Sequence, residues 1–585
     1  MKRYFNSTIK TLMAFMALGL CASCSDVWDE HYSVDPSIVP EQSILQMLEA
    51  NKETSEFVNV LKTTFTYNGK KRVDAVSYYD LLGADQFLTV WAPVNDALSA
   101  EDWAVYTKQN KTEEENFMTS QRFLKNHIAR FNHPVGKDGA HVTMMSTKRY
   151  EMMQNSIQHA TYKEKNQPCS NGILHIIDEA LQYNPNLYEY LTTDAQYKNN
   201  LGKFLESYTK YEINEEKSVA AGIVDGKTVY VDSVLEEVSI LLDKFGYINK
   251  EDSTYKVVLP SGSAYEKAYE AILPRYDYAY VDKADSLQWF WANSALLTDA
   301  FFNMNPQEQP IHFIGADGNR TLDWMTSTTF DIDEYYLTDK MYHLYRMEPG
   351  NEFYRPYNPD IVECSNGEVV VCDEWPFLPE ETYDAPIVRE AENAAGRLMN
   401  DDLTSIQELP IHTIRNYQYL EQPFYTSDIS RGKILLVKGK QAITDRWRLD
   451  FDIYDNLAGY YNFYVVIVPN CINGDVVPPK PNPFTVELSW YDETGYYQSY
   501  SPKDGKRAIT FENDPTKLDT VLVAKQIYIP VCNYGQPEAQ VKLSMTCAIA
   551  SNKISKYSNT MLLDCIIVEP TTAPEPEPEP EPVEE

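Results

Sequence analysis

The chain has 585 residues, too many for one hydrophobic core, and at roughly 150 residues per domain this length predicts three or four domains. Acidic residues outnumber basic ones by 86 to 51, so the formal charge is −35. A nucleic-acid ligand would need a local basic patch on such a chain, and the sequence shows none, which argues against nucleic acid as a partner.

Residues 1–23 have the pattern of a signal peptide. A basic start precedes the apolar run 12–20, which is too short to cross a bilayer. The small residues in Ala22-Ser23-Cys24 resemble a lipobox, in which the signal is cleaved before a cysteine that becomes acylated. The resemblance implies lipid attachment at Cys24. The alternative is plain secretion, with Cys24 as an ordinary thiol.

Residues 24–40 form an acidic tether that begins at this cysteine. Asp26, Asp29 and Glu30 follow Cys24 closely, and such a cluster resembles the export signal of Bacteroidota surface lipoproteins. The resemblance implies an outer-membrane, lipid-anchored protein exposed on the cell surface. A solvated segment of charged residues explains the same composition.

Cysteine pairing is left open by the sequence. Of nine cysteines, Cys21 lies in the signal and Cys24 is the lipid site, so an odd number remains and these cannot all pair. We expect mostly buried thiols and not a disulfide scaffold.

The first unit combines helices with strands. Residues 41–63 predict two short helices, because apolar residues recur at helical spacing on both sides of a break. An aromatic and β-branched strand begins at Phe87 and ends at Pro93, and Asn95 or Asp96 can cap the helix that follows. The unit closes with PCSNGILHIIDE at 168–179, where a Ser-Asn-Gly turn leads into an apolar strand.

Three segments of this unit resemble the fasciclin, or FAS1, domain. TVWAPVNDAL at 89–98 resembles its first signature box, LKNHI at 124–128 its central segment, and NGILHIID at 171–178 its second box. The resemblance implies that residues 41–183 form an α+β wedge. It also implies a role in adhesion or in contact with protein or glycan, not in catalysis.

The closing segment occurs twice, which indicates an internal repeat. ECSNGEVVVCDE at 363–374 matches it, and YKVVLPSGSAY at 255–265 repeats the strand, the proline and the helix start. Residues 184–379 are therefore expected to form a second, divergent FAS1-like domain. Its second half is longer by about 28 residues. We place this insertion at 303–360 and expect it to carry contacts.

Residues 385–569 predict an all-β sandwich. Apolar and polar residues alternate at 446–453, 484–490 and 541–547, as in half-buried strands. Asn-Gly and Thr-Gly turns separate such strands, and no long helical pattern occurs after about residue 400.

Two short segments complete the organisation of the chain. REAEN at 389–393 resembles the first strand of jelly-roll carbohydrate-binding modules, and the acidic Pro/Glu tail at 570–585 cannot pack and is expected to be disordered. The expected fold class is α+β: two FAS1-like wedges, the second with an insertion, followed by a jelly-roll-like sandwich.

No segment predicts catalysis. The nine histidines show no metal-ligand spacing, and neither a Gly-x-Ser-x-Gly elbow nor a phosphate-cradling glycine loop occurs. His127 and His175 are interpreted as structural residues. Carboxylates are so frequent that no pair stands out as a glycosidase pair. We predict no catalytic residue, no metal site, no cofactor and no enzyme activity.

Tyrosine supplies the candidate ligand-binding residues. Proteins commonly hold sugars against aromatic faces that are flanked by hydrogen-bonding groups. The candidate sugar-binding residues are therefore Tyr491, Tyr496, Tyr497 and Tyr500. Trp490 is in register with predicted core residues, so Tyr491 is expected to point outward. The alternative is that these tyrosines only pack the faces and edges of the sandwich.

Bacteroidota FAS1-domain lipoproteins are the proteins that the whole chain resembles. Such proteins often accompany SusC/SusD-like nutrient importers. The resemblance implies a non-catalytic surface protein that captures a glycan or peptide, or contacts the importer. The alternative is an adhesin that contacts host or neighbouring-cell proteins through its FAS1 domains, and a surface hydrolase is a third reading.

Overall fold

The computed structural model describes residues 40–574, apart from gaps at 69–70, 85, 137–139, 214–218, 225–226, 233–234, 280, 305–312, 315–319, 322, 327–329, 333–338, 342, 349, 422, 475 and 548. The predicted signal peptide, Cys24, the tether up to residue 39 and residues 575–585 of the tail lie outside the described residues. Part of the predicted insertion does so too.

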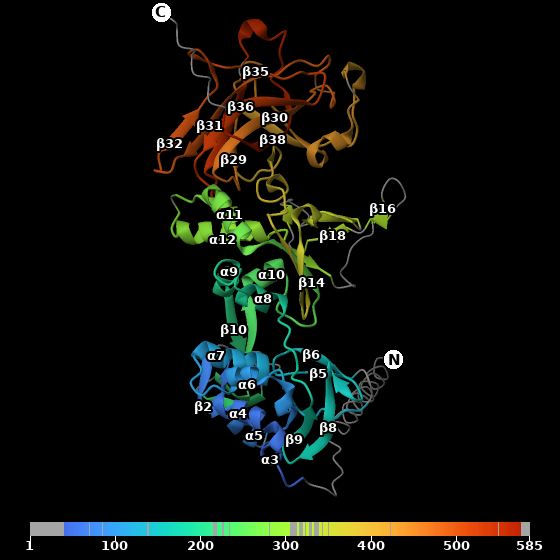
Figure 1. The fold of residues 1–585 in the computed structure, drawn as a ribbon. Coiled ribbons are helices and arrows are strands. Elements are labelled where there is room, and N and C mark those ends of the chain that lie inside the picture. Colours follow the sequence, from blue (N-terminus) through green and yellow to red (C-terminus); the bar gives the residue numbers. More distant parts are fainter. Residues whose placement is uncertain are drawn as a thin grey trace, which may run out of the picture.

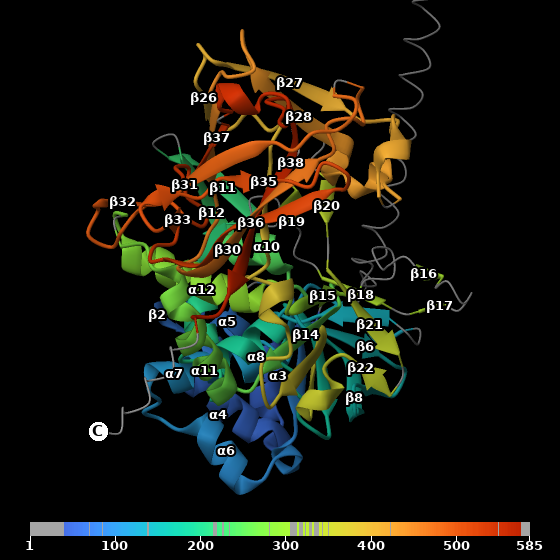
Figure 2. The ribbon, with the colours of Figure 1, turned by 90° about the horizontal axis from the view of Figure 1, so that it is seen from above.

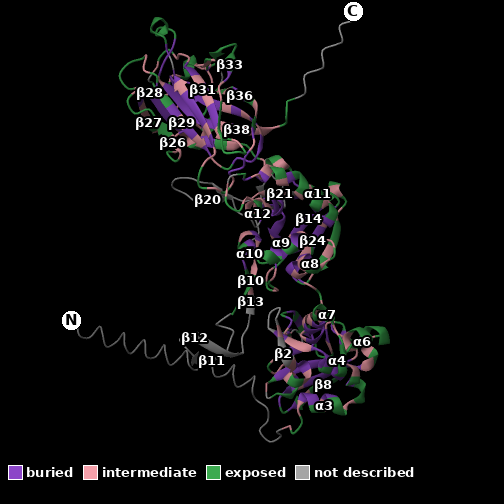
Figure 3. Cartoon of the chain, turned by 90° about the vertical axis from the view of Figure 1, so that its left-hand side faces the viewer, coloured by how far each residue is buried: buried purple, intermediate pink, exposed green. Residues whose placement is uncertain are grey.

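Three domains are stacked end to end (Figure 1). We call them the N-terminal domain (residues 40–183), the middle domain (184–384) and the C-terminal β-domain (385–574). Each encloses buried residues of its own (Figure 3), and the N-terminal domain and the β-domain lie at opposite ends. Within the described ranges, no helix has the length and apolar character needed to cross a membrane. The mixed α+β class predicted from the sequence is confirmed.

A seven-stranded sheet organises the N-terminal domain. Its order is β4 (Ile128–Arg130), β3 (Leu88–Pro93), β9 (Gly172–Ile177), β8 (Ala160–Cys169), β7 (Ser156–Ile157), β6 (Arg149–Met152) and β5 (Ala140–Thr143). All of β3 is buried because both of its faces are covered. Leu88 and Val90 join the core under the helices, whereas Trp91 joins a second small core on the opposite face.

Short helices cover one face of this sheet. They are α3 (Ile44–Ala50), α4 (Ser55–Thr63), α5 (Tyr78–Gly83), α6 (Ala100–Thr107) and α7 (Glu113–Met118), and a hairpin of β1 (Phe65–Asn68) and β2 (Lys71–Ser77) lies between α4 and α5. Ser43, Ser77 and Thr112 begin three of these helices with capping boxes, in which side chain and backbone satisfy each other's free groups. Such caps let helices of under ten residues persist when packed on a sheet.

The middle domain repeats the central part of this sheet. Its order is β15 (Phe301–Asn303), β14 (Tyr255–Pro260), β24 (Gly367–Cys372) and β23 (Asp360–Cys364). Strand β14 pairs in parallel with β24 in the register in which β3 pairs with β9. Its helices are α8 (Leu187–Thr193), α9 (Leu201–Ser207), α10 (Ile240–Phe245), α11 (Gly262–Ile272) and α12 (Ala284–Leu297).

Two further features distinguish the middle domain. A ladder of β10 (Thr209–Ile213) with β13 (Leu235–Ser239) and a hairpin of β11 (Val219–Val224) with β12 (Lys227–Asp232) stand between α9 and α10. The extra residues lie between β15 and β23, where 304–359 replace the much shorter 131–159 of the N-terminal domain. They include β16 (Phe313–Ile314), β17 (Arg320–Thr321), β18 (Asp323–Met325), β19 (Phe330–Ile332), β20 (Asp339–Met341), β21 (Leu344–Glu348) and β22 (Asn351–Glu352).

The repeated Ser-Asn-Gly turn performs the same structural task in both domains. The Asn171 side chain accepts the Ile44 amide at 2.8 Å and donates to the carbonyl oxygens of Leu82 and Ala84 at 2.9 and 3.0 Å. It thereby ties the start of α3 to the C-terminal end of α5. Asn366 makes the equivalent three bonds, with the Leu187 amide and the carbonyl oxygens of Ile248 and Lys250.

Glycine follows each of these asparagines for a steric reason. Gly172 and Gly367 have positive φ angles of 145° and 153°. A Cβ on Gly172 would lie 1.8 Å from the carbonyl oxygen of Leu88, and one on Gly367 would meet the Tyr255 carbonyl oxygen at the same distance. The repeat is therefore a backbone lock.

Two six-stranded antiparallel sheets build the C-terminal β-domain (Figure 2). The first contains β25 (Ile387–Glu390), β27 (Thr404–Pro410), β28 (Lys433–Gly439), β30 (Gly459–Val468), β36 (Asp519–Ile529) and β38 (Met561–Thr571), and the second β26 (Arg397–Met399), β29 (Arg448–Ile453), β31 (Pro483–Tyr491), β32 (Tyr497–Tyr500), β35 (Phe511–Glu512) and β37 (Val541–Cys547). A small hairpin of β33 (Lys503–Asp504) and β34 (Arg507–Ala508) follows β32. Alternate residues of both sheets, such as Leu449 and Phe451 of β29, fill one shared core.

The β-domain is joined to the middle domain by an apolar contact. Leu457 and Cys532 of the β-domain belong to the core of the middle domain. The rings of Trp291 and Tyr534 meet edge to face at 4.9 Å, and Gly535 leaves no room for a Cβ, which would come within 2.6 Å of Trp291. The two domains therefore share packing as a single core does.

Candidate ligand-binding sites

The β31–β32 hairpin exposes three of the four tyrosines selected from the sequence. Tyr496 is 72% exposed, Tyr497 60% and Tyr491 43%. Tyr491 and Tyr497 are cross-strand partners whose rings lie 5.7 Å apart, edge to face. Their positions follow from parity, because Leu488 of β31 faces the core and Tyr491 lies an odd number of residues further along.

Asp492 braces the turn of this hairpin. Its Oδ1 accepts the Thr494 amide at 2.9 Å, the Thr494 hydroxyl at 2.7 Å and the Tyr496 amide at 3.1 Å, while Oδ2 accepts the Gln498 side chain at 2.6 Å. These bonds, with that from the Thr494 hydroxyl foremost, lower the pKa of the Asp492 carboxyl. The turn therefore holds its neighbouring rings in defined positions.

Tyr500 lies differently. It pairs with Leu488 across the hairpin, is half-buried and packs against the shared core. Cross-strand partners share a face, so Tyr500 follows Leu488 inward. Tyr491, Tyr496 and Tyr497 thus form one exposed group, which we call the hairpin tyrosines, and Tyr500 supports the strand beneath them.

A second tyrosine surface lies on the other sheet. Tyr460 of β30 and Tyr528 of β36 are cross-strand partners with rings 4.9 Å apart. Tyr464 follows on the same face of β30, and its hydroxyl donates to Glu569 at 2.9 Å. The alternation in β30 places Tyr461 and Phe463 in the core, so it predicts that Tyr464 faces outward. The contact between Tyr460 and Tyr528 depends on a strand pairing that the sequence does not reveal.

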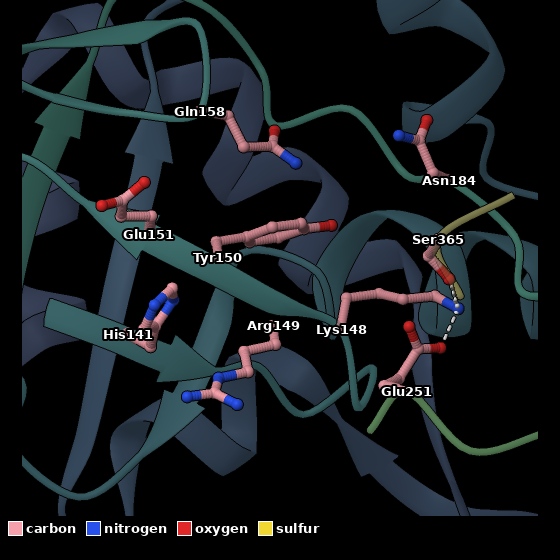
Figure 4. A pocket seen from close by; sticks show the side chains of 9 residues that line it. All are labelled: His141, Lys148, Arg149, Tyr150, Glu151, Gln158, Asn184, Glu251 and Ser365. Atoms are coloured by element: carbon pink, nitrogen blue, oxygen red, sulfur yellow. Dashed lines mark hydrogen bonds and ion pairs between the residues drawn. The ribbon is translucent and has the colours of Figure 1, made fainter. Parts of the chain in front are cut away.

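A polar pocket of about 480 Å³ lies where the N-terminal domain meets the middle domain. Figure 4 shows Lys148, Glu251 and Ser365 together on one side, with His141 and Arg149 along the β5–β6 strands. Its walls come from two domains, so its shape depends on how they are held together.

Lys148 is the centre of this domain joint. Its side chain is only 1% exposed, and Nζ lies 2.6 Å from both Glu189 Oε2 and Glu251 Oε1 and 3.3 Å from Ser365 Oγ. The Tyr183 ring lies 5.0 Å from the same ammonium group. A cation taken out of water needs such partners, so the joint is held by charge, in contrast to the apolar joint above.

Two buried histidines have structural bonds. His127 Nδ1 donates to the Phe123 carbonyl at 2.8 Å, and Nε2 accepts the Leu181 amide at 2.9 Å. His175 stacks on Trp91 with ring centroids 5.2 Å apart. Burial lowers the pKa of both imidazoles to about 4, so both are neutral at physiological pH.

Buried carboxylates gather near the start of the β-domain. Asp564 accepts the Ser430 amide, and Glu390 accepts the Ser430 hydroxyl at 2.5 Å. Burial raises the pKa of Glu392 and of Asp564 to about 7. Within the described ranges, no group of three or more His, Cys, Asp or Glu side chains is arranged to hold a metal ion.

The cysteines that the structure describes are free thiols. Six of the seven are buried, and Cys364 is half-buried. Burial raises the pKa of the Cys169 thiol to about 11, so it stays protonated and unreactive beside the Ser-Asn-Gly turn.

Comparison with known proteins finds solved structures to which this chain is similar. No protein-family model matches the sequence, and no curated protein matches it. A FAS1 domain pair from the insect cell adhesion molecule fasciclin I is 15% identical, and the match covers 57% of this chain and 99% of that one at a TM-score of 0.18.

Carbohydrate-binding modules are also among the matched structures. The C-terminal family 22 module of Clostridium thermocellum Xyn10B is 9% identical, with 32% of this chain and 92% of that one covered at a TM-score of 0.18. The CBM22-1–GH10 modules of xylanase 10B from the same organism, complexed with xylohexaose, are 13% identical at a TM-score of 0.19. That match covers 32% of this chain and only 28% of the xylanase chain.

Proposed function

We propose that this protein binds a glycan at a cell surface, without catalysis, through the hairpin tyrosines. The observation that carries the proposal is that three exposed rings share one hairpin whose turn Asp492 braces. Aromatic rings offer apolar faces to the C–H groups of a sugar, and rings that are already positioned lose little entropy on binding.

The cellular address is part of the same proposal. We propose that residues 1–23 are a signal peptide, that Cys24 carries a lipid, and that the protein lies on the outer face of the outer membrane of a Bacteroidota cell; the lipobox-like Ala22-Ser23-Cys24 and the acidic tether support this. There it serves as an accessory to a SusC/SusD-like importer of glycan or peptide. Two FAS1-like domains then act as a stalk below a jelly-roll-like domain. The strand register and the asparagine lock common to both stalk domains support their shared origin.

The apolar joint decides how the proposal should be tested. Deleting the β-domain would remove Leu457 and Cys532 from the core of the middle domain and expose that core to water. Loss of binding by such a deletion would not identify a site. Point variants on exposed side chains avoid this problem.

The test uses the full chain on glycan arrays. The triple variant Tyr491→Ala/Tyr496→Ala/Tyr497→Ala removes the hairpin tyrosines and should weaken binding roughly ten- to thousandfold, at about 0.5–1.5 kcal/mol per aromatic contact. The matched control Tyr417→Ala/Tyr419→Ala/Tyr425→Ala removes three other exposed tyrosines of the same domain and should leave affinity unchanged.

The possible results separate the functions. Glycan binding that the triple variant retains would refute the site, and binding to neither a glycan nor an importer from outer-membrane extracts would refute the function. Binding to an extracellular protein that survives the triple variant would indicate an adhesin acting through the FAS1-like domains.

A further inference from the structure

Two exposed phenylalanines are joined by a backbone hydrogen bond at the end of the N-terminal domain that lies away from the middle domain. Phe87 precedes β3 and Phe131 follows β4, and the Phe131 amide donates to the Phe87 carbonyl at 3.0 Å. Phe87 is 47% exposed and Phe131 63%. Strand β9 runs from this end towards the middle domain, so both rings lie at the pole furthest along the sheet from that domain. We call this end the anchor pole.

The position of Phe131 is fixed at a conformational cost. Its φ is +67°, in the left-handed region that bulky residues rarely adopt. The Thr89 hydroxyl donates to the Phe131 carbonyl at 2.7 Å and accepts the His133 amide at 2.9 Å, which holds the loop in this conformation. The strained backbone presents an apolar ring to the outside, the reverse of what packing alone would favour.

The middle domain provides an internal comparison. The bond from the Phe131 amide to Phe87 has its counterpart in the bond from the Met304 amide to the Thr254 carbonyl, at 2.7 Å. Thr254 and Met304 therefore occupy the equivalent positions, at the pole that faces the N-terminal domain through Ser365 and Lys148. Aromatic side chains stand at the pole at the end of the molecule, whereas the equivalent pole inside the stack carries threonine and methionine.

The chain enters the N-terminal domain at the same pole. The Ser170 amide donates to the Gln42 carbonyl at 2.8 Å, and α3 begins directly afterwards at the asparagine lock. Residues 24–39 separate Cys24 from the described chain, and covalent geometry limits their span to roughly 55 Å. This step rests on the lipid anchor of the proposed function. If Cys24 is acylated, the anchor pole is the part of the folded protein tethered closest to the bilayer.

The small apolar area that the two phenylalanines expose favours lipid over protein. At these exposures, two phenylalanine side chains present roughly 200 Å², given about 150–250 Å² for a whole aromatic residue. A standard protein interface takes about 800 Å² from each partner. A pair of rings is instead sufficient for shallow insertion beside an existing anchor, because the acyl chains already supply attachment.

We propose that Phe87 and Phe131 insert into the lipid–water interface of the bilayer that holds the acylated Cys24. The rings then act as a second contact that fixes the orientation of the N-terminal domain. The β-domain, at the other end of the stack, is held away from the lipid with the hairpin tyrosines in water.

The test measures depth in the membrane. The full-length acylated protein first receives the substitution Cys364→Ser, which leaves mainly buried thiols. Three separate variants of this chain then carry a spin label, at Phe87→Cys, at Phe131→Cys or at the control Val105→Cys. Val105 is as exposed as Phe131 but lies on α6. In phosphatidylcholine vesicles, the accessibility of each label to oxygen is divided by its accessibility to a water-soluble nickel chelate. This accessibility ratio should be severalfold higher for the labels at 87 and 131 than for the label at 105. Any label that attaches to the remaining native thiols is measured on the chain that carries Cys364→Ser alone, and this background signal is subtracted.

The outcomes distinguish this inference from the function it rests on. Equal accessibility ratios at all three sites, with Cys24 shown to be acylated by mass spectrometry, would overturn the inference and leave the anchor intact. Low accessibility to both reagents at 87 and 131 would mean that protein covers them and would overturn it too. An unmodified Cys24 would refute the anchor and the inference together, while glycan binding by the hairpin tyrosines would be unaffected.

Discussion

Replacing Asn171 by alanine tests whether the repeated motif is the structural lock described above. The substitution removes three hydrogen bonds, one to the Ile44 amide and two to the carbonyl oxygens of Leu82 and Ala84. Asn171 is 5% exposed, and Ile44 and Leu82 are fully buried, so water cannot readily replace the lost partner. A buried polar group left without a partner costs about 1–3 kcal/mol, and three such groups predict a loss of about 3–5 kcal/mol after relaxation.

Hydrogen exchange resolved by peptide measures this loss in the correct domain. Protection of β3 and β9 should fall by roughly two to three orders of magnitude, since each 1.4 kcal/mol is a factor of about ten. Protection of β14 and β24 should stay unchanged.

Asn366→Ala is the matched variant, because its three bonds have nearly the same lengths in the middle domain. In this variant, the protection of β14 and β24 should fall, and that of β3 and β9 should stay unchanged. A fall of less than about tenfold in the domain that carries the substitution would contradict the hydrogen-bond reasoning.

Three further predictions concern charge. Because the pKa of His127 and His175 is about 4 in the folded chain and about 6.5 in an unfolded one, only the unfolded state takes up protons between these values. The N-terminal domain should therefore lose up to about 3 kcal/mol per histidine as the pH falls from 6.5 to 4, seen as lower protection factors in its sheet once the intrinsic exchange rate at each pH is divided out; a flat profile of protection factors would contradict this. The C-terminal β-domain should behave oppositely, since burial raises the pKa of Glu392 and Asp564 to about 7 and their neutral forms favour the fold. Its protection should fall as the pH rises from about 4.5 to 7, less steeply in Glu392→Gln. Lys148→Met removes the cation that the partly exposed carboxylates of Glu189 and Glu251 share at the domain joint. It should cost about 1–3 kcal/mol of joint stability, between the values for exposed and for buried pairs, seen by small-angle scattering as a larger radius of gyration; an unchanged profile would count against a charge-held joint.

The elements most fully predicted from the sequence are those fixed by local chemistry. The Ser-Asn-Gly turns were recognisable because few residues other than asparagine and glycine accept the required backbone angles. The strand alternation around Leu449 and Phe451 gave the inward face of β29 correctly. Phe87, by contrast, was expected within the buried strand, but β3 begins one residue later and the ring is exposed.

What could not be predicted depends on contacts between distant segments. No sequence pattern around Lys148 predicts its burial, which arises from Glu189, Glu251 and Ser365 of the next domain. Tyr528 joins Tyr460 only because β30 pairs with β36. In the candidate site, parity predicted that Tyr491 faces outward, but not that Tyr500, a member of the same group, packs inward.

The two domain joints differ in how they would carry a mechanical load. If the protein binds a ligand and is lipid-anchored as proposed, tension between the ligand and the membrane passes through both joints in series. The joint at Trp291 and Tyr534 resists by close packing, whereas the joint at Lys148 is held by ion pairs, in one of which the Glu189 side chain is 30% exposed. If the joint at Lys148 yields first, the middle domain and the β-domain move together as one arm, because they share a core. The reach of that arm, and not the stiffness of the whole stack, would then set the volume that the proposed ligand-binding end can search.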